Sequence, residues 1–237
     1  MKTAAGGEID VLDSGGFGSV TIDKSITIAA EGTIAGVLVS GTNGITVNAG
    51  PSDVVILRNL DMNGLGTGLN GIDFQAGGVL MVEHSNIREF ALNGINFAPS
   101  SSAQLVVADT DLRNNAGDGI LASAGAVSLD HVRLENNSNG LEVGGHATVR
   151  DSLAVNNSGS GFAVSPSGDV NIENSVASNN HRGVYANGGT MRISNMTITN
   201  NSIGISYTSP GRVASYHNNK VADNGSSLAP NGIIFQQ

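Results

Sequence analysis

Apolar residues in this chain recur in short groups that alternate with polar residues. A glycine followed by an apolar residue opens many of these groups, at Gly71, Gly94, Gly119, Gly140, Gly161, Gly183 and Gly204, in steps of 21 to 25 residues. A second motif, Ile172-Glu173-Asn174-Ser175-Val176, alternates apolar and polar residues on both sides of a central asparagine. Alternation with a period of two predicts strands. Asparagine predicts a bend between two of them, because it tolerates the left-handed backbone conformation better than other non-glycine residues.

The repeat predicts stacked coils, each with three short strands: one that opens with the glycine, one before the bend and one after it. We expect short polar side chains to occupy the bend in successive coils, at Asn59, His84, Asp109, His131, Asp151, Asn174, Asn195 and Asn218. Equivalent strands pair in parallel at about 4.8 Å per coil, and crossovers between parallel strands are almost always right-handed. The sequence therefore predicts an all-β fold, a single-stranded right-handed parallel β-helix (a solenoid) of about nine coils, as one domain over residues 1–237.

Pairs of asparagines at 114–115, 136–137, 156–157, 179–180 and 200–201 each precede a glycine–apolar pair. These repeats resemble right-handed parallel β-helix proteins of the pectate-lyase-like superfamily, and the resemblance extends over residues 6–237. It implies the fold but no single activity, because that superfamily includes lyases, hydrolases, tailspikes and adhesins. Its members usually carry a helical cap at the N-terminal end of the core. Only five residues precede Gly6, so we expect no such cap, and we expect self-association through the exposed coil ends.

Composition narrows the function classes. The net charge of −9 and the scattered distribution of the 11 Lys and Arg residues argue against nucleic acid as a partner. The absence of cysteine excludes disulfides and thiolate metal ligands. Without a run of about 18 apolar residues, no membrane span is expected, and no motif indicates a cofactor. We expect a soluble protein, and the resemblance implies secretion or display at a cell surface.

In carbohydrate-active relatives, the groove lies over the outer side of one set of strands. If these are the strands that open with glycine, their outward residues are Asp73, Asn96, Leu121, Glu142, Ala163, Tyr185 and Ser206. Asp73 and Glu142 would lie three coils apart, or roughly 14 Å, which is too far for the paired carboxyl groups of a glycoside hydrolase. The sequence therefore predicts no catalytic residue here.

A denser group of charges is expected on the strand after the bend. Neighbouring coils would bring together five candidate substrate-binding residues, Arg88, Asp111, Arg113, Arg133 and Glu135. Such a group could bind an acidic polysaccharide, although cross-strand ion pairs on a solvated surface are the more common outcome of this pattern. His84 and His131 would be about 9.6 Å apart, too far to share a metal ion. We expect no metal site.

The interpretation that we favour is a non-catalytic structural or surface-display domain, or an engineered scaffold built on such a domain. The alternative is a carbohydrate-binding or polysaccharide-cleaving protein. It is supported by the charged group and by a longer loop expected at residues 207–231, which would carry Tyr207, Arg212, Tyr216 and His217. A trimeric phage or adhesin fragment would need an exposed apolar stripe, for which the candidates are Leu121, Leu153, Val155 and Val176.

Overall fold

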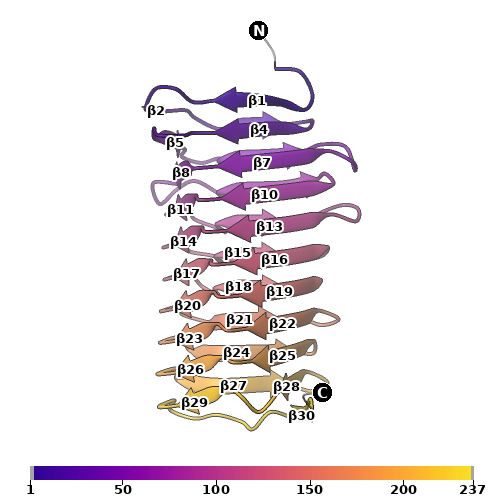
Figure 1. Cartoon of the computed structure of the whole chain (residues 1–237). Helices are drawn as coiled ribbons and strands as arrows, with labels where there is room; N and C mark the ends of the chain where they lie inside the picture. Colours follow the sequence, from indigo (N-terminus) through magenta and orange to yellow (C-terminus); the bar gives the residue numbers. More distant parts are fainter. Residues whose placement is uncertain (1–2, 236–237) are drawn as a thin grey trace.

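The chain forms a rod of stacked coils built from three parallel sheets (Figure 1). The computed structural model describes residues 3–235, and within this range the regular elements are all strands. Sheet A has 11 strands in chain order: β1 (Gly7–Asp10), β4 (Ile26–Ala29), β7 (Val54–Arg58), β10 (Val79–Glu83), β13 (Gln104–Ala108), β16 (Ala126–Asp130), β19 (His146–Arg150), β22 (Asp169–Glu173), β25 (Thr190–Ser194), β28 (Arg212–Ser215) and β30 (Gly232–Ile233).

Sheets B and C complete each coil. Sheet B has 10 strands: β2 (Gly15–Gly16), β5 (Ala35–Leu38), β8 (Leu60–Asn63), β11 (Asn86–Arg88), β14 (Asp111–Arg113), β17 (Arg133–Glu135), β20 (Leu153–Val155), β23 (Val176–Ser178), β26 (Thr197–Thr199) and β29 (Lys220–Ala222). Sheet C has nine: β3 (Val20–Ile22), β6 (Ile45–Asn48), β9 (Ile72–Ala76), β12 (Ile95–Phe97), β15 (Ile120–Ala122), β18 (Leu141–Val143), β21 (Ser160–Val164), β24 (Arg182–Asn187) and β27 (Ile203–Thr208).

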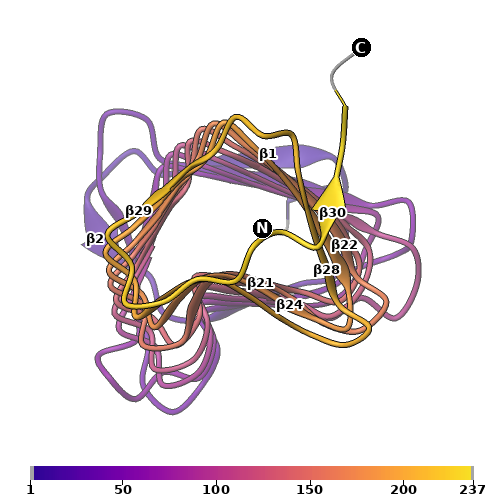
Figure 2. The same cartoon turned by 90° about the horizontal axis from the view of Figure 1, so that it is seen from below.

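The view along the rod shows these sheets as the three sides of each coil (Figure 2). Every strand pairs in parallel with its counterpart in the next coil, so residues one coil apart stack directly, as Ile95 stacks on Ile120. The prediction of an all-β solenoid with three strands per coil is confirmed. The rod has about ten turns by its strand count, close to the nine predicted.

Inward side chains of all three sheets form one continuous apolar core. The largest are phenylalanines, and the rings of Phe74 and Phe97 stack in adjacent coils with centroids 4.8 Å apart. The recurring glycine has a steric reason. A Cβ added to Gly140 would lie 2.5 Å from the carbonyl oxygen of Gly161 in the next coil, and equivalent glycines meet the same obstacle. Only glycine therefore lets the coils approach to strand-pairing distance here.

The predicted bend between sheets A and B is confirmed at seven of its eight residues. Asn59, His84, Asp109, His131, Asp151, Asn174 and Asn195 all have φ between +48° and +57°. The prediction for the eighth residue, Asn218, was wrong, because the neighbouring His217 takes the left-handed conformation, with φ of +62°. The register explains the difference, because Ile193 aligns with Ser215 and Asn195 therefore aligns with His217. The side chain of Asn218 instead accepts a hydrogen bond from the backbone of Asn195.

The second asparagine of each pair builds a buried ladder where sheet B turns toward sheet C. Asn157 is 1% exposed; its Oδ1 accepts from the backbone N–H of Asn137, and its Nδ2 donates to Asn180 Oδ1 (2.9 Å each). Its Nδ2 also donates to the carbonyl of Leu134 at 3.1 Å. Asn115, Asn137, Asn180 and Asn201 make the same kinds of contact. The ladder thereby satisfies backbone groups that the turn leaves without strand partners.

The prediction of a long loop at residues 207–231 was wrong. The segment contains strands β28 and β29, which extend sheets A and B by another coil. Its wider spacing from the preceding glycine hid the strand Arg212–Ser215, in which Val213 is fully buried. As a result, Tyr216 directly follows a strand of sheet A.

Candidate functional site

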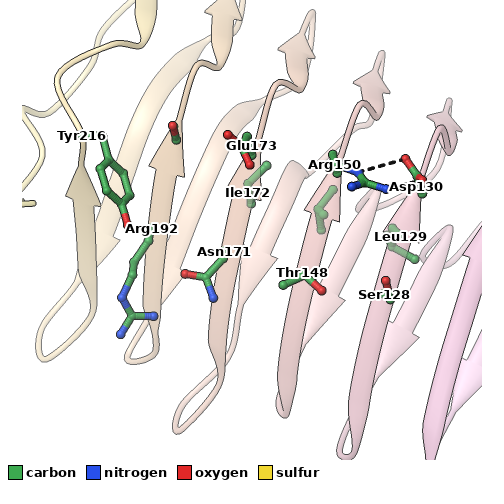
Figure 3. Close-up of a pocket in the computed structure, with 12 residues that line it drawn as sticks. Ser128, Leu129, Asp130, Thr148, Arg150, Asn171, Ile172, Glu173, Arg192 and Tyr216 are labelled. Carbon is green, nitrogen blue, oxygen red and sulfur yellow. Dashed lines mark hydrogen bonds and ion pairs between the residues drawn. The ribbon is translucent and has the colours of Figure 1, made fainter. Parts of the chain in front are cut away.

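A groove runs along the outer side of sheet A, across strands β16, β19, β22 and β25 (Figure 3). Its volume is about 710 Å³. We call it the sheet A groove. Strand residues alternate between the core and solvent. Each coil therefore adds its own outward polar side chains to the groove. One row consists of Ser128, Thr148, Asn171 and Arg192, and the other consists of Asp130, Arg150, Glu173 and Ser194.

Tyr216 closes the last-coil end of the groove. It follows β28, and its ring lies beside Arg192 in the close-up (Figure 3). Tyrosine combines an apolar ring with a polar hydroxyl, a combination that suits contact with the ring of a sugar. The rest of the floor supplies amide, hydroxyl and guanidinium groups at a repeat of about 4.8 Å. A linear glycan has rings at a similar repeat, so successive rings could meet equivalent donors.

Three of the four charged side chains that line the sheet A groove form ion pairs. Arg150 Nη2 lies 2.6 Å from Asp130 Oδ2, and Arg192 is paired with Asp169. Hydrogen bonds from Arg150 lower the pKa of Asp130, and His131 contributes to the same effect. The side chain of Arg150 is nevertheless 61% exposed. Its unused N–H groups can therefore donate to a carboxylate or hydroxyl in the groove.

A group of possible metal ligands lies at the edge of this groove. One ligand atom from each of Asp130, His131 and Asp151 falls within 4.8 Å of the others. Sequence reasoning missed this group because it compared His131 with His84 and not with carboxylates of its own and the next coil. Asp130 already bonds Arg150 and, at 2.9 Å, His131 Nδ1. The positive guanidinium opposes a second cation, so the geometry favours an ion-paired turn.

Sheet B brings together the five residues predicted to bind substrate, but in two subsets. Arg88 and Arg113 line a shallow cavity of about 440 Å³ with Asp61, a residue outside the predicted set. Arg88 makes a two-pronged ion pair with Asp61, with one arm at 3.1 Å. Arg113 donates to Asn86 Oδ1 at 3.4 Å, and no carboxylate among residues 3–235 lies within 4.0 Å of its guanidinium.

The other subset is Asp111 of β14 with Arg133 and Glu135 of β17, the next strand along the rod. Arg133 Nε donates to Glu135 Oε2 of its own strand at 2.7 Å, and this contact raises the pKa of Arg133. Asp111 aligns with Arg133 in the neighbouring strand. Within this subset Arg133 and Glu135 form an ion pair, whereas Arg113 keeps donors available to a ligand.

The outward residues of sheet C align as predicted, from Asp73 through Asn96 to Ser206. Asp73 is 8% exposed and accepts hydrogen bonds from the side-chain amides of Asn43, Gln75 and Asn96, at 2.7 to 3.2 Å. Three donors already occupy this carboxylate. It has little capacity left for a ligand.

Comparisons with known proteins agree with this architecture. The sequence profile of the family described as right handed beta helix region matches residues 18–170 and 121–234. The chain belongs to this family. No curated protein sequence matches the chain.

Two solved structures are similar to this β-helix. The crystal structure of pectate lyase Pel9A superposes with a TM-score of 0.65 and 17% sequence identity, over 98% of this chain and 69% of the lyase chain. The A-module of the Azotobacter vinelandii mannuronan C-5 epimerase AlgE4 superposes with a TM-score of 0.57 and 13% identity, over 98% of this chain and 90% of the module. These likenesses confirm the right-handed parallel β-helix and the resemblance to pectate-lyase-like proteins. At such identities they establish the fold alone.

In this β-helix, one carboxyl group has a pKa near neutrality. Burial raises the pKa of Asp118 to about 6, against hydrogen bonds from Asn139, and nearby Glu142 adds to the rise. Asp118 is 7% exposed and belongs to a second ladder, formed by Asn43, Asn70, Asn93, Asp118 and Asn139. A perturbed pKa can mark a catalytic group. This one is enclosed by hydrogen bonds of the turn between sheets B and C, and it does not line the sheet A groove.

The structure describes no helix with the length and hydrophobicity of a membrane span within residues 3–235.

Proposed function

We propose that this β-helix binds an acidic polysaccharide along the sheet A groove and does not cleave it. The observation that carries the proposal is the row of outward polar side chains that successive coils supply, Ser128, Thr148, Asn171 and Arg192, with Tyr216 at its end. The names of the two similar structures, a pectate lyase and a mannuronan epimerase, refer to acidic polysaccharides. They support this class of ligand.

The charge pattern supports binding without cleavage. The groove carboxylates Asp130 and Glu173 align two coils apart, about 9.6 Å, with Arg150 between them. An inverting glycoside hydrolase also separates its carboxyl groups widely, but one of them must act as an acid with a raised pKa. Arg150 instead lowers the pKa of Asp130. A carboxylate held in its charged form cannot serve as a proton donor near neutral pH.

The predicted sheet B residues remain a second proposed binding surface. Arg113 supports it, because its guanidinium lies at a cavity beside Arg88 and bonds only a neutral amide within the described residues. Binding there would use Arg88, Asp111, Arg113, Arg133 and Glu135, as the sequence suggested. The two surfaces lie on different sides of the coil (Figure 2), so variants can separate them.

Titration calorimetry with polygalacturonate, alginate and a neutral glycan, each with and without Ca²⁺, tests the proposal. Arg192→Ala and Asn171→Ala should weaken binding of the acidic glycans about tenfold or more, since a hydrogen bond to a charged group contributes roughly 1.5–3 kcal/mol. Arg113→Ala is the matched control on sheet B. If Arg113→Ala abolishes binding and the groove variants do not, the site is on sheet B.

A lyase and reducing-end assay on the same glycans tests the second half of the proposal. Product formed by the wild-type protein, and lost with Glu173→Gln, would contradict binding without cleavage. No binding of any glycan would contradict the first half. It would leave a structural or display role, or an engineered scaffold, as the interpretation to keep.

A further inference from the structure

Asparagine followed by glycine is a chemically labile pair, and this chain contains eight such pairs. The backbone nitrogen of the glycine can attack the side-chain Cγ of the asparagine, which forms a cyclic succinimide and releases ammonia. Water then opens the ring at either carbonyl and leaves aspartate or isoaspartate in place of asparagine. Glycine permits the attack because it has no Cβ to obstruct it. The asparagines of these pairs are Asn43, Asn63, Asn70, Asn93, Asn139, Asn187, Asn224 and Asn231.

The stacking of the coils protects most of these pairs. The attacking nitrogen must give up its proton, so an N–H that donates to a carbonyl is not available for the attack. In six pairs the glycine N–H donates to a backbone carbonyl of a neighbouring coil at 2.9 to 3.0 Å. These glycines are Gly44, Gly64, Gly71, Gly94, Gly140 and Gly225. In a seventh pair the amide of Asn231 is held in place, because it accepts from the N–H of Val213 at 2.7 Å and donates to the carbonyl of Gly211 at 3.0 Å.

The eighth pair, Asn187 and Gly188, lies where β24 ends and the chain turns toward β25. No atom of residues 3–235 accepts a hydrogen bond from the backbone N–H of Gly188. Asn187 is exposed, and its Oδ1 accepts a hydrogen bond from the hydroxyl of Thr208 at 2.9 Å. That hydrogen bond draws electrons away from Cγ, the atom that is attacked. This pair therefore combines an accessible amide with a nitrogen that makes no hydrogen bond within the described chain.

The same turn has the backbone freedom that ring closure needs. Gly188 takes the left-handed conformation, with φ of +79°, and a second glycine, Gly189, follows it. Gly211 of the next coil packs against the nitrogen of Gly188, so the turn must open before this nitrogen can reach Cγ. Two consecutive glycines allow backbone conformations that other residues disfavour. Opening one exposed turn also costs far less than separating the paired strands that hold the other pairs.

We propose that Asn187 is a site of spontaneous deamidation in the folded protein, whereas the fold protects the other seven pairs. The nitrogen of Gly188 forms a bond to Cγ of Asn187, the bond from Cγ to the side-chain nitrogen breaks, and ammonia leaves. One water then breaks either ring bond to the nitrogen of Gly188. Both products add a negative charge to the turn that leads into β25, and isoaspartate also lengthens the main chain there by one methylene group. The modification is independent of glycan binding.

Peptide mapping by mass spectrometry, after incubation of the protein at mildly alkaline pH, tests the proposal. Trypsin cleaves after Arg182 and Arg192 and releases residues 183–192, in which Asn187 is the only asparagine. This peptide should gain the mass difference between a hydroxyl and an amino group at least about tenfold faster than the sites at Asn93 and Asn139, which react only when the coils open. In concentrated urea, which unfolds the coils, the three rates should become similar. Digestion in mildly acidic solution limits further reaction during handling.

Two variants provide controls. Gly188→Ala places a Cβ beside the attacking nitrogen and should slow the reaction at Asn187 severalfold. Asn187→Gln keeps the amide on a longer side chain, and the more acidic form that ion-exchange chromatography detects in the incubated wild type should not appear.

Other outcomes would overturn the proposal. Deamidation of Asn93 or Asn139 in the folded chain as fast as that of Asn187 would show that the bonded N–H groups give no protection. An Asn187 that stays intact in the folded chain, while the same residue reacts in urea, would show that the turn does not open. If far-UV circular dichroism shows that Gly188→Ala loses its strands, the exposed change Asn187→Gln remains decisive, because an acidic form that persists in it contradicts the assignment to Asn187.

Discussion

Replacing Asp118 with asparagine should stabilise the β-helix at neutral pH. In the ladder of Asn43, Asn70, Asn93, Asp118 and Asn139, each asparagine Nδ2 donates to Oδ1 of the preceding member, as Asn93 does to Asn70 at 3.2 Å. Asp118 has an oxygen where the others have this nitrogen. It can donate to Asn93 Oδ1 only when its carboxyl group is protonated.

The size of the effect follows from the shift in pKa. Burial raises the pKa of Asp118 from 3.8 to about 6 in the folded chain. The folded state therefore holds the proton more tightly than the unfolded state. Stability is greatest below the unfolded value, falls as the pH rises between 3.8 and about 6, and stays lower above it. The shift amounts to about 3 kcal/mol at neutral pH.

Asp118→Asn should remove this loss. At about pH 7.5 the variant should be about 3 kcal/mol more stable than the wild type, a rise in Tm of roughly 6 to 12 °C for a chain of this size. At about pH 4 the difference should fall below 1 kcal/mol, because most of the loss has not yet occurred. Thermal melts at a series of pH values measure both quantities. Asp111→Asn, which changes an exposed carboxylate on β14, is the control and should leave Tm unchanged.

Two results would refute this reasoning. If Asp118→Asn does not raise Tm at about pH 7.5, the charged form is not unfavourable in the folded chain. If it raises Tm equally at low and neutral pH, the gain comes from a source other than the proton.

Four further substitutions test how the coils hold together. Asn157→Ala leaves the backbone N–H of Asn137 without its partner and should lower the free energy of unfolding by about 2 to 4 kcal/mol in urea titrations. Asn136→Gly, at the exposed first position of the pair 136–137, should change the free energy of unfolding by less than about 0.5 kcal/mol. Phe162→Ala should cost about 3 to 5 kcal/mol in the same titrations through the cavity it leaves. Gly140→Ala should lower Tm, because its Cβ would lie 2.5 Å from a carbonyl oxygen of the next coil.

The sequence predicted the fold because each coil repeats the same local requirements. Glycine recurs where a Cβ would strike the next coil, and a short polar residue recurs where φ is positive. The pattern was wrong at Asn218, where an extra residue between His217 and Lys220 changes the spacing of the bend from the next strand. The two consecutive asparagines, Asn218 and Asn219, gave no indication that His217 would take the left-handed conformation.

The candidate site was harder to predict. The sequence indicated that Arg88 and Arg113 would approach each other, and they line one cavity. It did not indicate the sheet A groove, because Ser128, Thr148, Asn171 and Arg192 share no chemical type and meet only through the register of four strands. The pattern of residues along the sequence also did not predict which charged side chains form ion pairs. Whether Arg113 finds a carboxylate depends on side-chain geometry that strand spacing does not determine.

Each turn of the rod pairs with the turn before it and the turn after it, and with no other. Stability in such a molecule is a sum of neighbour contributions along one dimension. Duplication or loss of a whole turn would therefore change the length by about 4.8 Å without disturbing the remainder. The sheet A groove would lengthen or shorten by the same step. Gain or loss of single repeats would therefore let related chains bind ligands of different length.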